Sequence, residues 1–484
     1  MKKRRTLAAF LAFVLMAAVL IVGCQNEGEK GAENSTGAGT TGVGSGTVGT
    51  SQEETTEFPY PQIPEGTDYS GRTFTLYSWP ANSPNYYIIE EESSEAVEQA
   101  AYNRYRNVET QLEIEIDNLV ESQYNIASEN FMLLTSSGEA FCDVFIAQSV
   151  YLQINMSTAG LLYNWYDLNC DFSQPYWNQQ VIENLSVGDV LLAMHSDFVQ
   201  TNVNALAFNK DILIDDGIPL PYDQVENGTW TLDAFLNITK NLTKDMNGDG
   251  VFDETDRYAW RFAYRDYLTS FMYGSNITAV TIEDDKAVIF QDMEKMGTLV
   301  DKVHQLIYND TRTIPVFEGN QAVLFEDGRC VFDLRCVGSN MRDLEFNYGF
   351  LPIPKFDEQQ KEYYTNTYAE LMLLPITLED PAFTGLVIEM LSAESRLEFM
   401  PAYIDTMMQH KVARDPEDAE ILLDLYNHII WEFGYVYANW NNISFTLPWM
   451  MRDNTTNVNA WYEAYAPAYQ TQLDQMLDKI KSAY

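Results

Sequence analysis

The sequence predicts an α/β protein built on doubly wound sheets, and three observations support this prediction. Segments with the period of a strand alternate with segments with the period of a helix from residue 73 onward. The composition is globular, with 46% hydrophobic residues. The chain of 484 residues is long enough for two or three domains with large buried cores.

The stretch that begins near residue 73 shows the alternation most clearly. RTFTLYSW has the period of a strand, and SSEAVEQAAYNRYRNVETQL has the period of a helix that Ser93 or Ser94 could cap. EIEID, NIASENFMLLTSSG and CDVFIA then predict a strand, a helix that ends at Gly138 and a buried strand. The β-α-β-α-β order predicts the start of a doubly wound sheet with right-handed crossovers.

The middle of the chain predicts a second unit of the same kind. DVLLAMHSDF and VNALAFNKDILIDDGI indicate two strands and the start of a helix, and TWTLDAFLNITKNLTK indicates an amphipathic helix. YAWRFAY, RCVFDLR and NYGFLPIPKFD indicate further strands. Residues 380–484 are expected to be mostly helical.

The first residues predict export and a lipid anchor. MKKRR is a positively charged start, an apolar run follows it, and LIVGC places Gly23 before Cys24. This order resembles a bacterial lipobox, in which residues 1–23 are removed as a signal peptide and the Cys24 thiol is diacylated. Residues 24–66, rich in Gly, Ser, Thr and Glu, are expected to be a flexible tether. An ordinary signal or membrane anchor with an incidental cysteine is the alternative.

Charge and cysteine content exclude several kinds of partner and site. The chain carries 29 Lys and Arg against 71 Asp and Glu, so its surface should repel nucleic acid and anionic lipid headgroups. The remaining cysteines show no CxxC spacing, which disfavours a zinc site or a thioredoxin motif. Cys330 and Cys336 lie along one predicted strand, too far apart for a disulfide. The expected packed thiols are Cys142, Cys170, Cys330 and Cys336.

The stretch DMNGDGVFDETD, residues 245–256, predicts a calcium loop. Oxygen donors recur at alternating positions around Gly250, which permits a sharp turn, and Phe252 is expected to point back to the core. A helix precedes the loop and a strand follows it, so the pattern is half of an EF-hand. A closed shell of oxygens would make the Ca²⁺ structural, and a solvated acidic turn without metal is the alternative. The predicted ligands are Asp245, Asn247, Asp249, Val251 through its carbonyl, Asp253 and Asp256.

An ordered set of segments resembles one known family over nearly all of the mature chain. After the lipobox and tether come FTLYSW, FCDVFIA, LLAMHSDF, LAFNKDILIDDGIPLP, TWTLDAF, DMNGDGVFDETDRYAW, GRCVFDL and YGFLPIPKFDEQQKEYYT. This order is similar to that of the extracellular solute-binding proteins of ABC importers. The carbohydrate-binding branch, built like maltodextrin-binding protein, shows the greatest similarity. The long C-terminal region departs from the shorter members of that family.

The resemblance implies a type II periplasmic-binding-protein-like fold, with two lobes that close on a ligand in the cleft at the hinge. The chain should cross between the lobes at residues 189–208 and 346–368. The expected N-terminal lobe comprises residues 67–195 and about 310–350, and the expected C-terminal lobe comprises residues 196–309 and about 351–484.

The function that this resemblance implies is capture of a carbohydrate, an oligosaccharide, for delivery to the permease subunits of an ABC transporter. The receptor would be a monomer, lipid-anchored on the outer face of the cytoplasmic membrane. A receptor for a peptide or another small solute is the alternative, followed by a secreted glycan-active enzyme. No catalysis is expected, because the sequence lacks G-x-S-x-G, H-E-x-x-H and a P-loop. The β-α-β order disfavours a third class, a calcium-braced adhesin.

Candidate ligand-binding residues follow from the position of each predicted strand. Ligands of open α/β sheets bind outside the carboxyl ends of the strands, and a sugar needs flat rings beside paired hydrogen-bonding groups. Trp79 and Trp260 are the predicted stacking platforms, with Asp197 and Arg335 as hydrogen-bonding partners. Trp165, Trp177 and Trp230 are expected mainly in the core. The full predicted set is Trp79, Gln148, Ser149, His195, Asp197, Trp260, Arg261, Arg335 and Tyr368.

Overall fold

The structure is a computed structural model that describes residues 58, 60–80, 91–149, 153–199, 201–262, 265–309, 312–314, 323–337, 341, 344–406, 413–437 and 443–484. Cys24, the signal peptide and most of the tether lie outside these residues, as do residues 81–87 of the loop after the first strand, which we expect on the cleft because it follows the carboxyl end of that strand. The description below concerns the compact unit Phe58–Tyr484. None of the described helices has the length and apolarity that a bilayer span requires.

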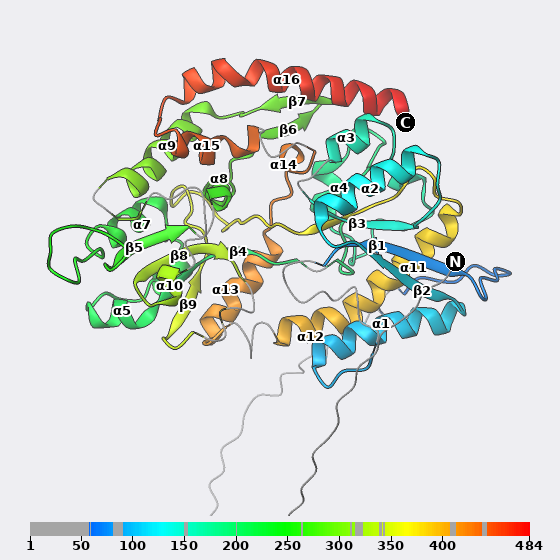
Figure 1. Cartoon of the computed structure of the whole chain (residues 1–484), viewed down its shortest axis with the longest axis horizontal. Helices are drawn as coiled ribbons and strands as arrows, with labels where there is room; N and C mark the ends of the chain where they lie inside the picture. The colour runs from blue at the N-terminus through cyan, green and yellow to red at the C-terminus, as the bar shows by residue number, and fades with distance from the viewer. Residues whose placement is uncertain are drawn as a thin grey trace, which may run out of the picture. The chain divides into compact units, whose positions relative to one another are not determined.

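The first sheet confirms the β-α-β-α-β opening (Figure 1). Its parallel strands are arranged in the order β3-β1-β2, and α1 and α2 connect them. β3 is buried along its whole length, as expected for an apolar strand covered on both faces. The bounds are β1 Thr73–Ser78, α1 Ala96–Leu112, β2 Glu115–Val120, α2 Tyr124–Ser136 and β3 Val144–Gln148.

The apolar spacing in the sequence predicts the buried face of helix α1, but the N-cap differs from the prediction. Every apolar residue predicted from the spacing is buried: Val97, Ala101, Tyr105, Val108 and Leu112. The expected cap is wrong, because Glu95 occupies the N-cap and makes no side-chain cap bond. Ser93 lies outside the helix, where its Oγ accepts the Glu95 N–H at 3.1 Å. Helix α2 ends as expected, with Gly138 at a φ of 81°.

A strand that the pattern did not predict completes the first sheet. β10 (Glu370–Leu373) pairs antiparallel with β3, so the order is β10-β3-β1-β2. α11 (Pro381–Glu394) follows β10 and packs against α1. α3 (Gln153–Thr158) follows β3 in the chain. We call this sheet with α1, α2, α3 and α11 the first lobe.

The second sheet has the order β5-β8-β4-β9. β4 is antiparallel to β8 and to β9, whereas β5 and β8 are parallel. We call this sheet and the helices on it the second lobe. Its strands are β4 Asn204–Asn209, β5 Tyr258–Phe262, β8 Cys330–Cys336 and β9 Tyr348–Leu351; its helices are α5 Lys210–Asp215, α7 Leu232–Thr239, α9 Met293–Tyr308, α10 Val323–Glu326 and α13 Pro416–Asn427.

The strand pairing corrects the expected division of the chain. Residues about 310–350 were assigned to the N-terminal lobe, but they contribute β8 and β9, which hydrogen-bond to β4 in the second sheet. In the range 351–484, assigned to the C-terminal lobe, β10 and α11 belong to the first lobe. The segment DVLLAMHSDF, expected as a strand, forms isolated bridges such as Met194–Met372.

The chain passes between the two sheets within the expected crossing ranges, residues 189–208 and 346–368. The first range runs into β4, and the second contains β9 and ends just before β10. The two crossing segments also hydrogen-bond to each other. The Asn204 N–H donates to the Asn366 carbonyl at 3.2 Å, and Thr365 Oγ1 donates to the Asn204 carbonyl at 2.6 Å. Asn204 Nδ2 donates to Asn366 Oδ1 at 3.0 Å, and both residues are buried. These buried hydrogen bonds fix the register in which the two segments pair.

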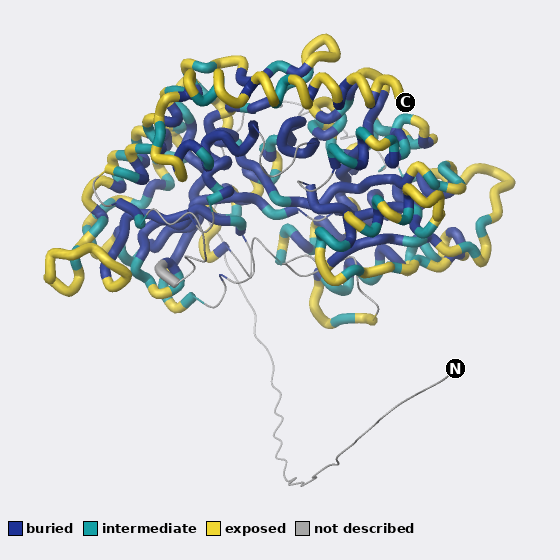
Figure 2. Tube along the Cα trace, turned by 45° about the horizontal axis from the view of Figure 1, so that its top comes forward, coloured by how far each residue is buried: buried dark blue, intermediate teal, exposed yellow. Residues whose placement is uncertain are grey.

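The remaining C-terminal elements are mostly helical, as expected. A hairpin that the sequence pattern did not predict, β6–β7, lies before α9. The strands of both main sheets are largely buried except for the edge strand β2, and the other exposed residues lie mainly on the outer helices and loops (Figure 2). The further bounds are α4 Gln179–Leu185, β6 Val280–Glu283, β7 Lys286–Ile289, α12 Met400–Asp405, α14 Phe433–Val436, α15 Thr446–Arg452 and α16 Val458–Ala483.

Candidate functional site

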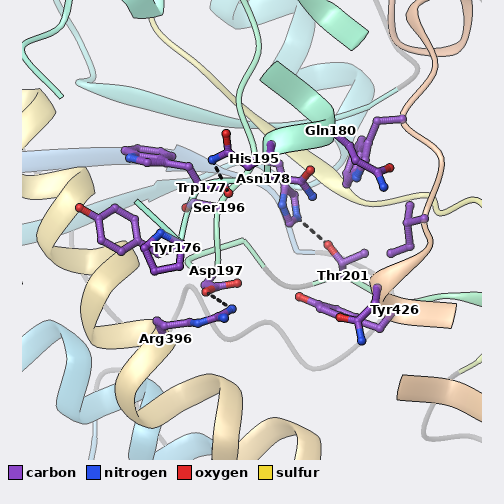
Figure 3. A pocket seen from close by; sticks show the side chains of 15 residues that line it. Tyr176, Trp177, Asn178, Gln180, His195, Ser196, Asp197, Thr201, Arg396 and Tyr426 are labelled. Atoms are coloured by element: carbon purple, nitrogen blue, oxygen red, sulfur yellow. Dashed lines mark hydrogen bonds and ion pairs between the residues drawn. The ribbon is translucent and has the colours of Figure 1, made fainter. Parts of the chain in front are cut away.

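A pocket with a volume of about 190 Å³ lies beside the first crossing segment (Figure 3). Residues 175–180 and 195–197 line it together with Arg396, whose helical turn packs on α1 and α11 of the first lobe. Tyr426, Asn427, Ile429 and Trp431 complete the lining. Residues 426–431 lie at and after the end of α13, which packs on β9 of the second lobe. The volume is below the roughly 300–1,000 Å³ of sites for drug-sized ligands. The pocket therefore has room for one ring-sized group.

Asp197 and Arg396 form the charged part of the pocket. Arg396 Nη1 donates to Asp197 Oδ2 at 3.2 Å from a π-helical turn, Ser395–Phe399. The Arg396 side chain is 47% exposed, against 12% for Asp197, so the guanidinium is the open end of the pair. Burial raises the pKa of Asp197 to about 6, although the Arg396 guanidinium acts in the opposite direction. A guanidinium has five N–H donors, so this pair keeps hydrogen-bonding capacity for a ligand.

His195 provides a neutral polar ring in the same pocket. Its Nε2 shares a hydrogen bond of 2.6 Å with Thr201 Oγ1, and its ring centroid lies 4.8 Å from that of Trp431. Burial lowers the pKa of His195 to about 3, so the imidazole is uncharged at neutral pH. His195 therefore contributes shape and a hydrogen-bonding partner, and Asp197 and Arg396 contribute the charge.

Several lining residues were not predicted from the sequence. Asn178 and Gln180 bring amide groups, and Tyr426 and Trp431 bring rings. Trp177, expected mainly in the core, is 2% exposed and also borders the pocket. The dense mixture of rings and amides in PYWNQQ and YNHIIW was the signal that could have identified them.

The two predicted stacking platforms are core residues instead. Trp260 is fully buried, and its Nε1 donates to the Leu306 carbonyl of α9 at 2.8 Å. Its ring packs edge-on against Phe235 of α7. Trp79 is 8% exposed and packs edge-on against Tyr124, with ring centroids 5.5 Å apart. The prediction is wrong for both, because the end of a strand can face a covering helix as well as a cleft.

The two predicted arginines are also part of the scaffold. Arg261 Nε and Nη2 donate to the two oxygens of Asp333 at 2.7 and 3.0 Å, across the β5–β8 pair. Arg335 Nη1 donates to Asp333 at 3.0 Å and to Glu326 at 2.8 Å. Burial opposes the charge on Arg261, but Asp333 outweighs burial and raises the pKa of Arg261. Because these donors face carboxylates inside the lobe, the ligand-binding role predicted for Arg261 and Arg335 is not supported.

Three further predicted residues lie near the second crossing segment. The Gln148 carbonyl accepts a hydrogen bond from Gln153 Nε2, and the Ser149 N–H donates to the Ala369 carbonyl at 3.3 Å. Tyr368 packs against Tyr267 with ring centroids 5.3 Å apart. The pocket itself includes His195 and Asp197 from the predicted set.

The loop at residues 245–256 is held by its own carboxylates. Asp245 accepts the N–H groups of Gly248 and Gly250 at 2.6 and 2.8 Å. The fully buried Asp256 accepts the Met246 N–H at 2.8 Å. Across the described part of the chain, no three or more His, Cys, Asp or Glu side chains are grouped so that they could hold a metal.

Two details of this loop test the sequence pattern. Gly250 has a φ of 80°, as expected for the sharp turn at that position. Phe252 is 42% exposed, so the expectation that it points into the core is wrong. The loop lies between α7 and β5 at the far end of the second lobe (Figure 1), where no core is available to Phe252. The order of helix, loop and strand is confirmed.

No family model and no curated protein matches the sequence. Solved structures match it at low identity. One is UgpB from Mycobacterium tuberculosis in complex with glycerophosphocholine, with a TM-score of 0.56 and 13% identity over 84% of this chain and 99% of that chain. A sugar transporter from Rhizobium etli in an open conformation has a TM-score of 0.55 and 13% identity, over 84% and 99%. An extracellular solute-binding protein from Staphylococcus aureus in complex with maltose has a TM-score of 0.53 and 10% identity, over 85% and 98%.

These likenesses establish the fold. The chain has the two-lobed α/β architecture of type II periplasmic-binding-protein-like structures, as the sequence predicted. At 10 to 13% identity they do not transfer a ligand to this chain. The class of ligand must therefore be inferred from the described residues that line the pocket.

Proposed function

We propose that the protein is a non-catalytic receptor that captures a carbohydrate and delivers it to an ABC permease. The observation that carries the proposal is the composition of the pocket, where rings of Tyr426 and Trp431 lie with the Asp197–Arg396 pair and the Asn178 amide. The C–H faces of a sugar pack on rings, and its hydroxyls pair with carboxylate, guanidinium and amide groups. The fold, shared with a solute-binding protein in complex with maltose, supports the same proposal.

The size of the pocket refines the proposal. A volume of about 190 Å³ holds one sugar ring. Further rings of an oligosaccharide would extend past Arg396, whose side chain is 47% exposed. The affinity for an oligosaccharide should therefore exceed that for its terminal monosaccharide only where rings outside the pocket also find partners.

The test is a binding screen by calorimetry and tryptophan fluorescence against mono- and oligosaccharides. Arg396→Gln should weaken binding of the selected glycan about 10- to 100-fold, because hydrogen bonds to charged groups contribute roughly 1.5–3 kcal/mol. Arg329→Gln, which removes a partly exposed arginine that is paired with Asp327 and does not line the pocket, is the matched control and should not change the affinity. Recovery of a hydrolysed glycan, or a clear preference for peptides, would contradict the proposal.

One observation favours a second candidate ligand. The half-exposed Arg396 guanidinium could also pair with a phosphate ester, and a protein of the same fold is in complex with glycerophosphocholine. Glycerophosphocholine and sugar phosphates therefore belong in the binding screen. Binding of these compounds in preference to neutral glycans would select the second candidate.

The lipid anchor and the location are part of the proposal. LIVGC and the tether that follows it support diacylation of Cys24 and attachment to the outer face of the cytoplasmic membrane. Cys24→Ala should release the protein to the medium or leave it unprocessed. Membrane fractionation that does not change in this variant, with no fatty-acid labelling of the wild type, would exclude the anchor.

The proposal includes one structural Ca²⁺ in the loop at residues 245–256. Its donors are all oxygens, as a hard cation prefers, and Gly250 has the conformation that such a turn needs. The carboxylates now accept backbone N–H groups, and the ion would share them. The ion would brace the far end of the second lobe and take no part in ligand capture.

A further inference from the structure

Helix α16 is one continuous helix that contacts both lobes. It packs against α9 and β7 and also against α3. α9 is fixed to the second lobe, where its Leu306 carbonyl accepts a hydrogen bond from Trp260. α3 belongs to the first lobe. In Figure 1 α16 runs along the top of the view, from above α9 to beside α3. It therefore links the lobes in addition to the chain segments that cross between them.

The C-terminal end of α16 is seated on the first lobe. Tyr484 Oη donates to the Leu162 carbonyl at 2.7 Å. Leu162 is buried and forms a bridge with Pro375, just after β10. A Cβ atom placed on Gly160 would lie 3.9 Å from the Cβ of Ala483. The last residues of the chain thus rest on a loop that is fixed to the first sheet.

The same helix also holds the β6–β7 hairpin. Gln470 Nε2 donates to the Ala287 carbonyl, and Lys481 Nζ donates to the Asp285 carbonyl, each at 3.0 Å. β7 leads into α9 after a short turn, so the hairpin is joined to the second lobe through the chain itself. The hairpin and α16 can therefore move as one body with α9.

Rotation of one lobe against the other would change the distance between α3 and α9. A helix of 26 residues is a rod about 39 Å long and does not stretch. Packed interfaces change between discrete arrangements and do not deform continuously. One end of α16 must therefore separate from its lobe when the lobes rotate. The first-lobe end is the terminal turn of the chain, where Tyr484 is 36% exposed.

We propose that α16 is a latch between the lobes. Docked on the first lobe through Ala483 and Tyr484, it holds the arrangement described here. When this end is released, the lobes can rotate about the paired crossing segments, and Tyr426 of α13 moves away from Asp197 and Arg396 of the first lobe. The proposal goes beyond the proposed function, because it concerns the motion of the lobes with any ligand or none.

The most direct test is a reversible disulfide between α16 and the first lobe. Gly160→Cys combined with Ala483→Cys introduces two cysteines whose Cβ atoms are 3.9 Å apart. This distance lies within the roughly 3.5–4.5 Å between the Cβ atoms of a disulfide. Gly160 has a φ of 66°, so the substitution strains the backbone, but equally in the oxidised and reduced forms. The wild type under the same oxidant is the control, since its described cysteines are free.

The locked and unlocked forms should differ without any ligand. We expect the small-angle scattering profile of the oxidised protein to fit a single compact conformation. After reduction, the profile should fit a mixture of compact and open conformations. If a glycan has been identified, oxidation should also slow its association at least about tenfold. Identical ligand-free profiles in the two redox forms would overturn the latch and leave the proposed ligand untouched. A difference in these profiles without binding of any glycan would instead contradict only the proposed function.

A single, conservative substitution tests the latch even if the double cysteine variant misfolds. Tyr484→Phe removes one hydrogen bond and should raise the released population about fivefold, the effect of one net hydrogen bond. The measurement is amide hydrogen exchange in α3 and in the last turns of α16, which should accelerate by that factor. Tyr465→Phe is the matched control, because Tyr465 lies on the same helix and is 48% exposed. Equal exchange in the two variants would also overturn the proposal.

Discussion

Each lobe contains a contact between an aspartate and an arginine, and the two contacts differ in burial and in the number of hydrogen bonds. In the second lobe, Arg261 binds both oxygens of the fully buried Asp333. At the pocket, Arg396 makes one hydrogen bond to Asp197 and is 47% exposed. A buried, doubly bonded pair is out of reach of a ligand, whereas an exposed guanidinium can still bind one. Burial and bond count, more than residue identity, separate the scaffold from the candidate site.

The strongest test of this comparison removes each aspartate. Asp333→Ala leaves Arg261 and Arg335 buried without their shared partner and should lower the free energy of unfolding by about 3–5 kcal/mol. Asp197→Ala should cost about 1 kcal/mol or less, because Arg396 can turn to water. Chemical denaturation measures both values. Equal losses would show that the two contacts have the same structural role.

The tryptophans extend the comparison to aromatic residues. Trp260→Ala removes a fully buried ring and the hydrogen bond to Leu306, and should cost about 3–5 kcal/mol of unfolding free energy. The variant that still folds should bind ligand as the wild type does. Tyr426→Ala at the pocket should show the opposite balance, with weaker ligand binding and a smaller loss of stability. Loss of ligand binding in a folded Trp260→Ala protein would instead support the predicted stacking of Trp260 on the ligand.

The pH dependence of stability tests the environment of Asp197. Its pKa of about 6 in the folded protein exceeds the ordinary value of about 3.9, so the folded state binds this proton more tightly. The resulting stability is present below about pH 4 and is lost as the pH rises through about 6, on the order of 3 kcal/mol. Buried His195, whose pKa is lowered to about 3, acts in the opposite direction and loses its contribution as the pH falls.

The difference between the wild type and Asp197→Asn therefore isolates the aspartate from the histidine. Unfolding free energies measured from pH 4 to pH 7 should differ in slope between the two proteins. Parallel curves would mean that Asp197 titrates in the folded protein as it does in the unfolded chain.

The smallest expected effect concerns the calcium loop. Ca²⁺ should raise the melting temperature of the wild type by a few degrees, because it binds only the folded loop, and a chelator should reverse the rise. Asp249→Ala should abolish this response and leave the affinity for ligand unchanged. Loss of ligand binding without loss of stability would place the ion in the binding site.

The strands and the first crossovers could be predicted because each depends on a local pattern. In α1 and β3, apolar spacing alone identifies which residues are buried. β10 has only the four residues ELML, without alternation, and it joins the first sheet through pairing with the distant β3. The lobe assigned to β8 and β9 was wrong for the same reason, because strand pairing between distant segments leaves no local trace.

The candidate site was predictable only in part. His195 and Asp197 were found because they follow a segment expected to lead into the hinge. Trp260 was misassigned, because the alternation of a strand does not show which side a helix covers. Trp177 reaches the pocket through an isolated bridge to Ser196, a contact between separate segments. The pair Asp197–Arg396 joins positions that no spacing rule connects.

The position of β10 in the chain has a consequence for how the protein folds. All strands of the second sheet, β4, β5, β8 and β9, lie in the chain between β3 and β10. The second sheet can therefore form from one continuous segment, whereas the first must wait for a strand that emerges after the second is complete. Until then the edge of β3 is unpaired, and such an edge invites association with other chains. The sheet that comes first in the sequence is thus the last to be completed, and the risk of association with other chains is greatest before β10 pairs with β3.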